Sequence, residues 1–173
     1  MKRRQIIFSL SSIFFAMVIL SLTIGREILS GAKASLVSLA IINFSGYLFI
    51  FLMPVEGLVP IYTAAGYNWF IILAIVLLTA IVAQIINYSV GSLMSEQFIK
   101  GLIGEKNYRR SYKHISNHGG WMILLFNILP LASSVLSLIA GMIRYDMKKL
   151  LMYSFIGLAI KYLAMLFLLG ALF

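Results

Sequence analysis

Long apolar runs alternate with short polar links along this chain. The runs lie at residues 5–25, 34–55, 68–91, 119–143 and 150–173. Each is about as long as the roughly 20 residues that an α-helix needs to cross the ~30 Å hydrocarbon layer of a bilayer. Because backbone amides at that depth must be paired within the protein, helices are the natural spanning element. The pattern therefore predicts an all-α integral membrane protein.

The first run predicts an uncleaved transmembrane helix, so that residues 1–33 form this helix and an outer link. Its apolar part is longer than the roughly 7–15 residues usual in a secretory signal peptide, and no small-residue cleavage pattern follows it. Lys2, Arg3 and Arg4 precede the run, and such cations mark the cytoplasmic side. We therefore expect a multi-pass protein of the plasma membrane with a cytoplasmic N-terminus, in which residues 34–173 form the main membrane domain.

The stretch 51–66, FLMPVEGLVPIYTAAG, interrupts the apolar pattern with two prolines and one carboxylate. Pro54 and Pro60 cannot both lie inside one straight helix, because each removes a backbone donor and crowds the preceding turn. Glu56 at membrane depth is costly unless it has a partner, a proton or water, so it is a functional candidate. Two topologies fit: residues 34–66 form a hairpin that enters and leaves from outside, or the first half of this range spans the membrane fully.

A further spanning helix is predicted over residues 68–94. Its later half carries the polar or small residues Gln84, Asn87, Tyr88 and Gly91. Their spacing of i, i+3, i+4 and i+7 puts them on one helix face. Two interpretations stay open for this face: it packs on a neighbouring helix through small and amide residues, or it lines a transport path.

Residues 95–118 form the largest polar segment, which we predict to be a basic cytoplasmic loop along the membrane surface. Cations alternate there with apolar residues at helical spacing, a pattern typical of an interfacial segment. Arg109, Arg110 and Lys113 are candidates for lipid-headgroup contacts, as is Arg144 farther along the chain. The alternative is a solvated loop whose charges only set the orientation of the protein.

The run 119–143 is again charge-free and again contains a proline, Pro130. If it forms a second hairpin, the cations that follow it stay on the cytoplasmic side with the basic loop, as the positive-inside rule favours. A last spanning helix is predicted over residues 147–173, and it contains Lys161. At about 1.5 Å per residue, Lys161 lies roughly 18 Å beyond Lys149, deep in the hydrocarbon layer, unless its side chain snorkels to the far interface.

Residues 51–66 and 126–141 repeat each other. Each window begins with Phe, has a proline near its fourth or fifth position, ends in Ala-Gly and precedes a spanning helix. Proline-broken segments at corresponding positions of two inverted halves point to a midplane substrate site in secondary transporters. The sequence therefore predicts two opposed, proline-broken re-entrant hairpins in an inverted repeat. The residues expected to shape these hairpins are Pro54, Pro60, Gly66, Pro130 and Gly141.

Composition agrees with a membrane protein, because 62% of the residues are hydrophobic, 11% are charged and the mean hydropathy is +1.02. Soluble domains carry about 25% charged residues. The net charge of +9 comes from cations at the ends of apolar runs, which is typical of orientation signals rather than of nucleic-acid binding. There is no cysteine, and His114 and His118 both lie in the polar segment. We therefore expect no metal site, no cofactor and no enzymatic chemistry.

Four short motifs follow one another between Pro54 and Tyr162. They are P-x-E at Pro54–Glu56 with Ala65-Gly66, N-Y-x-x-G at Asn87–Gly91, L-P at Leu129-Pro130 with Ala140-Gly141, and I-G-x-x-x-K-Y at Ile156–Tyr162. In this order and spacing the chain resembles the DedA family, also called the VTT-domain or SNARE-associated family, and most closely its small YqaA-like members. The resemblance implies two opposed re-entrant hairpins packed with transmembrane helices, and a role in moving lipids across the bilayer. Bacterial relatives are implicated in returning polyprenyl-phosphate carriers such as undecaprenyl phosphate with the proton-motive force, and eukaryotic relatives resemble phospholipid scramblases.

The resemblance also implies roles for single residues. Glu56 matches the family's hairpin carboxylate, and Lys161 stands where an arginine is usual in the small members. The chain departs from the family at Asn127 and Ser92, where arginines are common. The positions that often hold an acidic residue after the second proline are occupied by Ala132, Ser133 and Ser134.

From these features we expect a membrane lipid translocase that moves a phospholipid or a polyprenyl phosphate, coupled to protons through Glu56, with Lys161 as the balancing charge. The residues expected along the path are Glu56, Lys161, Gln84, Asn87, Tyr88, Asn127, Ser133 and Ser134. Two alternatives stay open: a proton-coupled carrier of a small ion or solute, and a membrane assembly protein whose basic loop recruits cytosolic partners. The sequence also leaves open whether the protein forms a homo-oligomer.

Overall fold

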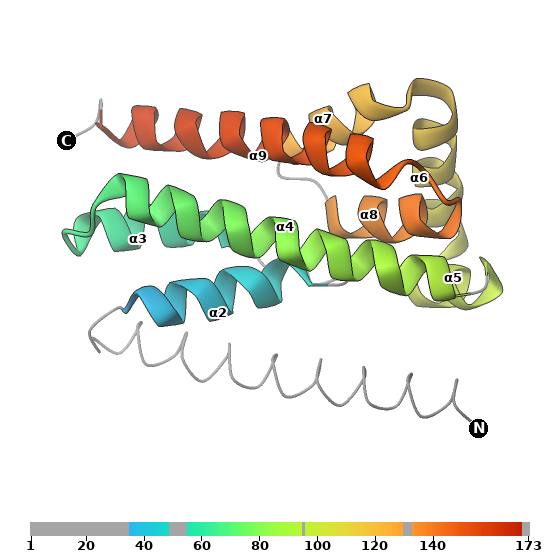
Figure 1. The fold of residues 1–173 in the computed structure, drawn as a ribbon, viewed down its shortest axis with the longest axis horizontal. Coiled ribbons are helices and arrows are strands. Elements are labelled where there is room, and N and C mark those ends of the chain that lie inside the picture. Colours follow the sequence, from blue (N-terminus) through green and yellow to red (C-terminus); the bar gives the residue numbers. More distant parts are fainter. Residues whose placement is uncertain (1–34, 49–54, 95, 130–132, 171–173) are drawn as a thin grey trace.

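The structure, a computed structural model, describes residues 35–48, 55–94, 96–129 and 133–170 (Figure 1). Every regular element in these ranges is a helix. The helix predicted within residues 1–33, together with Pro54 and Pro130, lies outside the described residues. Among the described helices, two are long and apolar enough to cross a membrane. This is the architecture expected of an all-α membrane protein.

The two long helices run antiparallel along the whole bundle (Figure 1). They are α4, Trp69–Leu93, and α9, Met147–Gly170. The Asn68 side chain caps α4 by accepting a 2.8 Å hydrogen bond from the Phe70 amide, and the Asp146 carboxylate caps α9 in the same way through the amides two and three residues later. Such caps satisfy amides that have no partner within the helix. Both helices therefore start at a polar residue and continue as apolar runs.

A pair of short helical segments lies beside the first half of α4 (Figure 1). It consists of α2, Leu36–Tyr47, followed by the 3₁₀ helix η1, Val55–Gly57, and α3, Leu58–Ala64. At about 1.5 Å per residue, α2 rises about 18 Å, well short of the ~30 Å hydrocarbon layer. The α3 helix runs back antiparallel to α2, so both ends of the pair lie at the same end of the bundle (Figure 1).

Pro60 and Gly66 occupy positions that suit them. Pro60 lies in the first turn of α3, where a missing backbone donor is tolerated. Gly66 follows α3 with a φ of +85°, a left-handed conformation that L side chains rarely adopt. The Gly66 amide donates to the Thr63 carbonyl and the Tyr67 amide to the Tyr62 carbonyl, so the turn into α4 is closed by backbone hydrogen bonds.

A second short pair lies at the opposite end of the bundle, with α7 beside α9 and α8 beside α4 (Figure 1). The α7 helix spans Gly120–Ile128 and α8 spans Ser133–Met142. The two short pairs therefore approach the middle of the long helices from opposite ends. Each has its own apolar core, around Leu39, Ile72 and Val76 for the first and around Ile123, Leu138 and Ile139 for the second.

Two glycines bring α4 and α8 into direct backbone contact. A Cβ added at Gly91 would collide with the Leu138 carbonyl, and a Cβ added at Gly141 would collide with the Tyr88 carbonyl. Only glycine permits so close an approach of two helices. The Gly91 part of the polar face predicted on α4 is thus a packing surface.

The basic segment that connects the two long apolar runs is helical, as its helical spacing of apolar residues suggested. It forms α5, Glu96–Ile103, and α6, Glu105–His118. The α6 helix lies across the end of the bundle where α4 ends and α9 begins (Figure 1). Tyr108 and Ile115 of α6 are buried in the same cluster as Leu150 of α9. This apolar stripe packs α6 against the end of the bundle.

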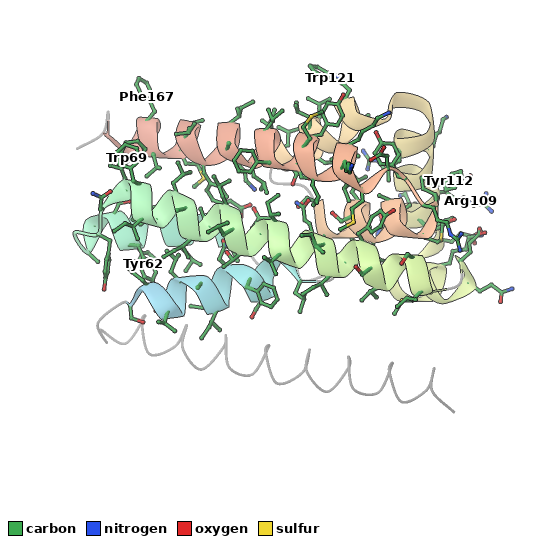
Figure 2. All side chains as sticks on the ribbon, in the orientation of Figure 1. Tyr62, Trp69, Arg109, Tyr112, Trp121 and Phe167 are labelled. Atoms are coloured by element: carbon green, nitrogen blue, oxygen red, sulfur yellow. The ribbon has the colours of Figure 1, made fainter. Side chains whose placement is uncertain are left out.

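The outer faces of α4 and α9 are apolar. Phe70 and Leu78 on α4 and Phe155 and Phe167 on α9 are exposed. Figure 2 shows Phe167 pointing away from the bundle, at the end opposite to Arg109 of α6. In water, continuous apolar faces of this kind are association or aggregation sites, but lipid tails cover them in a bilayer. The exposed side chains therefore agree with helices that face lipid.

Candidate functional site

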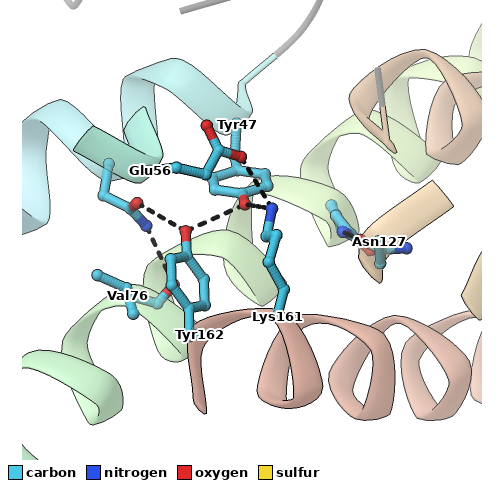
Figure 3. Close-up of polar contacts among 8 residues, drawn as sticks. Tyr47, Glu56, Val76, Asn127, Lys161 and Tyr162 are labelled. Carbon is cyan, nitrogen blue, oxygen red and sulfur yellow. Dashed lines mark hydrogen bonds and ion pairs between the residues drawn. The ribbon is translucent and has the colours of Figure 1, made fainter. Parts of the chain in front are cut away.

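Lys161 and Glu56 are the charged path residues predicted from the apolar segments, and they form an ion pair (Figure 3). Lys161 of α9 donates a hydrogen bond of 2.9 Å from Nζ to Oε1 of Glu56, which lies in η1. The Lys161 side chain is 8% exposed and that of Glu56 is 23% exposed. The buried ammonium is thus not snorkelling to an interface, and the carboxylate is the more accessible partner.

Two tyrosines complete the surroundings of the Lys161 ammonium. Nζ donates a second hydrogen bond of 2.7 Å to Oη of Tyr47, at the end of α2. It also lies 5.3 Å from the centroid of the Tyr47 ring and 5.2 Å from that of Tyr162. Aromatic faces within about 6 Å attract a cation, more strongly where water is excluded. A carboxylate, a hydroxyl and two rings therefore stabilise this charge.

The polar contacts continue from Tyr47 into the core between α2 and α4 (Figure 3). The hydroxyls of Tyr47 and Tyr162 lie 3.0 Å apart, and Tyr162 donates a 3.3 Å hydrogen bond to Oδ1 of Asn43. Asn43 Nδ2 donates in turn to the Val76 carbonyl at 3.0 Å and to Thr79 Oγ1 at 2.7 Å. Every polar group in this series is therefore paired.

Sequence reasoning missed Asn43 and Tyr47 and gave Tyr162 no role beyond its motif. One signal could have found the first two. An amide at Asn43 and a hydroxyl at Tyr47 stand four residues apart within the charge-free run 34–55, so they share a helix face, and polar groups at membrane depth need partners.

A second polar group, which we call the amide cluster, consists of Gln84, Asn127 and Ser154. Gln84 Nε2 donates to Asn127 Oδ1 at 2.7 Å, and Asn127 Nδ2 donates to Ser154 Oγ at 3.2 Å and to the Ile123 carbonyl at 2.8 Å. The three side chains come from α4, α7 and α9 and are at most 1% exposed. The amide cluster therefore joins the second short pair to both long helices.

Asn87 is the link between α4 and the ion-pair region. Its Nδ2 donates a 2.9 Å hydrogen bond to the backbone carbonyl of Tyr47. Asn87 is fully buried, so it fixes the end of α2 against α4. Gln84 and Asn87 thus both face the protein interior, as either interpretation of the predicted face requires.

Tyr88, Ser133 and Ser134 are also predicted along the path, and their described contacts are separate from the ion pair. Tyr88 donates a 2.7 Å hydrogen bond to the Tyr145 carbonyl and takes part in the contact between α4 and α8. Ser133 and Ser134 are buried at the start of α8. Among the described contacts, none joins the side chains of these three residues to Glu56 or Lys161.

The predicted headgroup-contact residues gather at the α6 end of the bundle. Arg109 pairs with Glu105 of the same helix at 2.7 Å, with both side chains more than half exposed. Arg110 and Lys113 are exposed on α6, and Arg144 is exposed between α8 and α9 with a φ of +54°. In the part of the chain that the structure describes, no three His, Asp or Glu side chains are placed to hold a metal ion.

The charged groups of α5 and α6 perturb one another. Burial, together with the neighbouring Glu96 carboxylate, raises the pKa of Tyr108 to about 12. Hydrogen bonds from Lys100 and Arg109 lower the pKa values of Glu96 and Glu105, respectively. At neutral pH the two carboxylates are therefore charged, and Tyr108, the buried member of the group, is protonated.

A comparison with known families decides the relationship that the motifs suggested. The model of the VTT domain, the domain of the DedA or SNARE-associated family, matches residues 53–171, which is more than half of the chain. The chain belongs to the VTT domain family. Comparisons with curated proteins and with solved structures gave no match. VTT domain proteins are membrane proteins, in agreement with the two long apolar helices.

Several VTT-like motifs have a structural role in this member. The N-Y-x-x-G motif places Gly91 against α8, and the Ala140-Gly141 motif places Gly141 against α4. The K-Y pair puts Lys161 and Tyr162 beside Glu56 and Tyr47. Asn43 and Tyr47 precede the matched range of the VTT domain, so this chain supplies part of the charged site from outside that range.

Proposed function

We propose that this VTT domain protein is a lipid translocase that moves a phosphate-bearing lipid, a phospholipid or a polyprenyl phosphate, across the bilayer. The observation that carries the proposal is the ion pair between the buried Lys161 and the partly exposed Glu56. Lys161 lies about 21 Å along α9 from Met147 at about 1.5 Å per residue, well inside a ~30 Å hydrocarbon layer. Charged residues at that depth are rare and mark substrate or ion pathways.

A lysine ammonium is a phosphate-binding group, and the arrangement around it supports an exchange of partners. Glu56 is more exposed than Lys161, so an anionic headgroup can approach the ammonium from the Glu56 side. Glu56 takes up a proton or turns away when the headgroup binds, which couples transport to protons. The acyl or prenyl tails remain in lipid throughout.

The two short helix pairs are, in this proposal, opposed re-entrant hairpins of an inverted repeat. Their approach to the middle of the long helices from opposite ends supports it (Figure 1), because short, interrupted segments in inverted halves form the midplane sites of secondary transporters. The protein lies in the plasma membrane as a multi-pass protein. Its N-terminus and the basic α5–α6 end face the cytoplasm.

The amide cluster and Asn87 line the path in the second half of the protein. Gln84 Oε1 is buried and has no hydrogen-bond partner among the described residues, so it is an acceptor that water or a headgroup can use. Ser133, Ser134 and Tyr88 remain predicted path residues. The proposal involves no enzymatic step, no cofactor and no nucleic acid.

Reconstitution tests the proposal. Liposomes with and without the purified protein receive a labelled phospholipid or a labelled polyprenyl phosphate, and transbilayer movement is followed with and without a pH gradient. Faster movement of either lipid with the protein is the expected result. Movement no faster than in empty liposomes would refute the translocase. Uptake of a small solute or ion without lipid movement would favour the solute carrier instead.

A membrane assembly role makes a different prediction. In a host that lacks its own VTT domain proteins, a variant with Lys106, Arg109, Arg110 and Lys113 neutralised should still complement if the protein is a translocase, provided that it inserts normally. Loss of complementation with normal transport in liposomes would favour the assembly role.

A further inference from the structure

We infer that three buried residues, Tyr47, Tyr162 and Asn43, which we call the tyrosine network, keep Lys161 charged when Glu56 is not paired with it. The inference rests on the proposed function, because it assigns a fixed charge to Lys161 and an exchangeable partner to Glu56. It makes Tyr47 and Tyr162 positioning residues, which act on a headgroup through Lys161.

The hydrogen bonds of the tyrosine network run in one direction. An ammonium only donates, so Tyr47 Oη accepts from Lys161 Nζ at 2.7 Å. The Tyr47 proton is then directed to Tyr162 Oη, 3.0 Å away, while Tyr162 donates to Asn43 Oδ1. Each hydroxyl thus turns its lone pairs toward the charge. Groups polarised in series in this way strengthen one another in a low-dielectric interior.

The far end of the tyrosine network is fixed to α4. Asn43 donates to the Val76 carbonyl and to Thr79, and the Tyr47 backbone carbonyl accepts from Asn87. Asn43 and Tyr162 are fully buried and Tyr47 is 5% exposed. The network is therefore held in place by three helices, whether or not Glu56 is present.

Glu56 is held much less firmly. It lies in a single 3₁₀ turn, it is 23% exposed, and within the described part of the chain its hydrogen bonding is the contact with Lys161. A group bound at one point and open on one side can exchange. The tyrosine network is held by several buried hydrogen bonds, whereas Glu56 is held by one. Glu56 is therefore the partner of Lys161 that can exchange.

No other described charge competes for this role. The titratable groups around Nζ are Glu56 from η1, Tyr47 from α2 and Tyr162 from α9 itself. The helices α4, α7 and α8 carry no acidic or basic side chain. Tyr62 of α3 bonds Ser38 and Tyr88 of α4 bonds Tyr145. Within the described ranges, the charge of Lys161 therefore depends on Glu56 and the tyrosine network.

The test is nitrogen NMR of the full-length protein, labelled with ¹⁵N at lysine Nζ and reconstituted in lipid at neutral pH. The resonance of Lys161 is the one that K161R removes. In E56Q we expect it to stay at the ammonium position. In E56Q/Y47F we expect it to move to the amine position, and E56Q/Y162F, in which the outer hydroxyl is missing, should shift it in the same direction.

Tyr62 provides the matched control, because it is a fully buried tyrosine whose hydroxyl bonds Ser38 and not the network. E56Q/Y62F should keep the Lys161 signal at the ammonium position. An amine signal in E56Q alone, or an ammonium signal in both E56Q/Y47F and E56Q/Y162F, would overturn the inference. The readout does not involve transport, so a failed translocase assay leaves this result standing by itself.

Discussion

Lys161 donates a 2.9 Å hydrogen bond to Glu56 across 105 residues of sequence. The contact joins the last long helix to the short segment that follows α2. Removing one member of a buried ion pair leaves the other charge without a partner. This lowers stability far more than the loss of an exposed ion pair does. The pair is the charged centre of the proposed transport site.

Gly91 and Gly141, which bring the backbones of α4 and α8 together, should be the glycines at which an alanine substitution lowers stability most. Gly91→Ala or Gly141→Ala places a Cβ against a backbone carbonyl that cannot rotate away, so each should lower the free energy of unfolding by about 1–3 kcal/mol. Thermal unfolding of the purified protein in detergent measures the effect.

Gly101 of α5 is the control for this prediction. A Cβ added at Gly101 meets no atom within 4 Å, and alanine is favoured over glycine in a helix by up to about 1 kcal/mol. Gly101→Ala should therefore leave stability unchanged or raise it. Equal losses at Gly101 and at Gly91 would show that the glycine contact is not the cause.

The amide cluster predicts a coupling between Gln84 and Asn127. Asn127→Ala removes partners from both Gln84 and Ser154, and leaving buried polar groups unpaired costs about 1–3 kcal/mol. Because Gln84→Ala disrupts the same bond, the double variant should lose less stability than the sum of the two single variants. Strict additivity in thermal unfolding would contradict the hydrogen bond. Ser89→Ala, on the exposed side of α4, is the control and should be neutral.

Neutralising the basic residues of α6 should change lipid binding without changing stability. The Arg109–Glu105 pair is exposed, and pairs of this kind contribute little to folding. The triple variant R109Q/R110Q/K113Q should unfold at the same temperature as the wild type but retain fewer anionic lipids, as counted by native mass spectrometry. High salt should reduce the wild type to the level of the variant. Unchanged lipid retention would remove these residues from headgroup contact.

The raised pKa of Tyr108 leads us to expect that the protein loses stability at alkaline pH. Its pKa of about 12 in the folded protein lies above the ordinary tyrosine value of about 10. The folded state therefore holds the phenolic proton more tightly, and the stability contributed by this group is complete below pH ~10 and lost as pH rises to ~12. The difference in unfolding temperature between wild type and Tyr108→Phe should shrink over this range.

Much of the fold follows from the sequence because its charges are so sparse. The helices expected over 68–94 and 147–173 correspond to α4 and α9, since apolar length and polar capping residues define both. The helical spacing of the basic segment agrees with α5 and α6, but it did not show where they pack. Its few apolar residues, such as Tyr108, are buried only because α6 packs across the bundle end, and that packing is a tertiary effect.

The sequence predicted those members of the site whose residue type is rare in an apolar segment. Glu56 and Lys161 are conspicuous as charges in apolar surroundings, and so the pair could be expected. Tyr47 and Asn43 were missed, because hydroxyls and amides occur in many helices and their contacts with Tyr162 cross more than 100 residues. Tyr88 shares a predicted face with Asn87 but packs against α8, since helix periodicity alone does not say which neighbour covers each part of a face.

Transbilayer lipid movement in liposomes carrying wild type, E56Q or K161A tests the central claim most directly. Loss of a charge-assisted contact of about 1.5–3 kcal/mol corresponds to about a tenfold or greater fall in rate, and we predict that fall for both variants. The controls E105Q and K148A alter exposed charges and should move lipid at the wild-type rate. Wild-type rates in both E56Q and K161A, with normal insertion, would contradict the account.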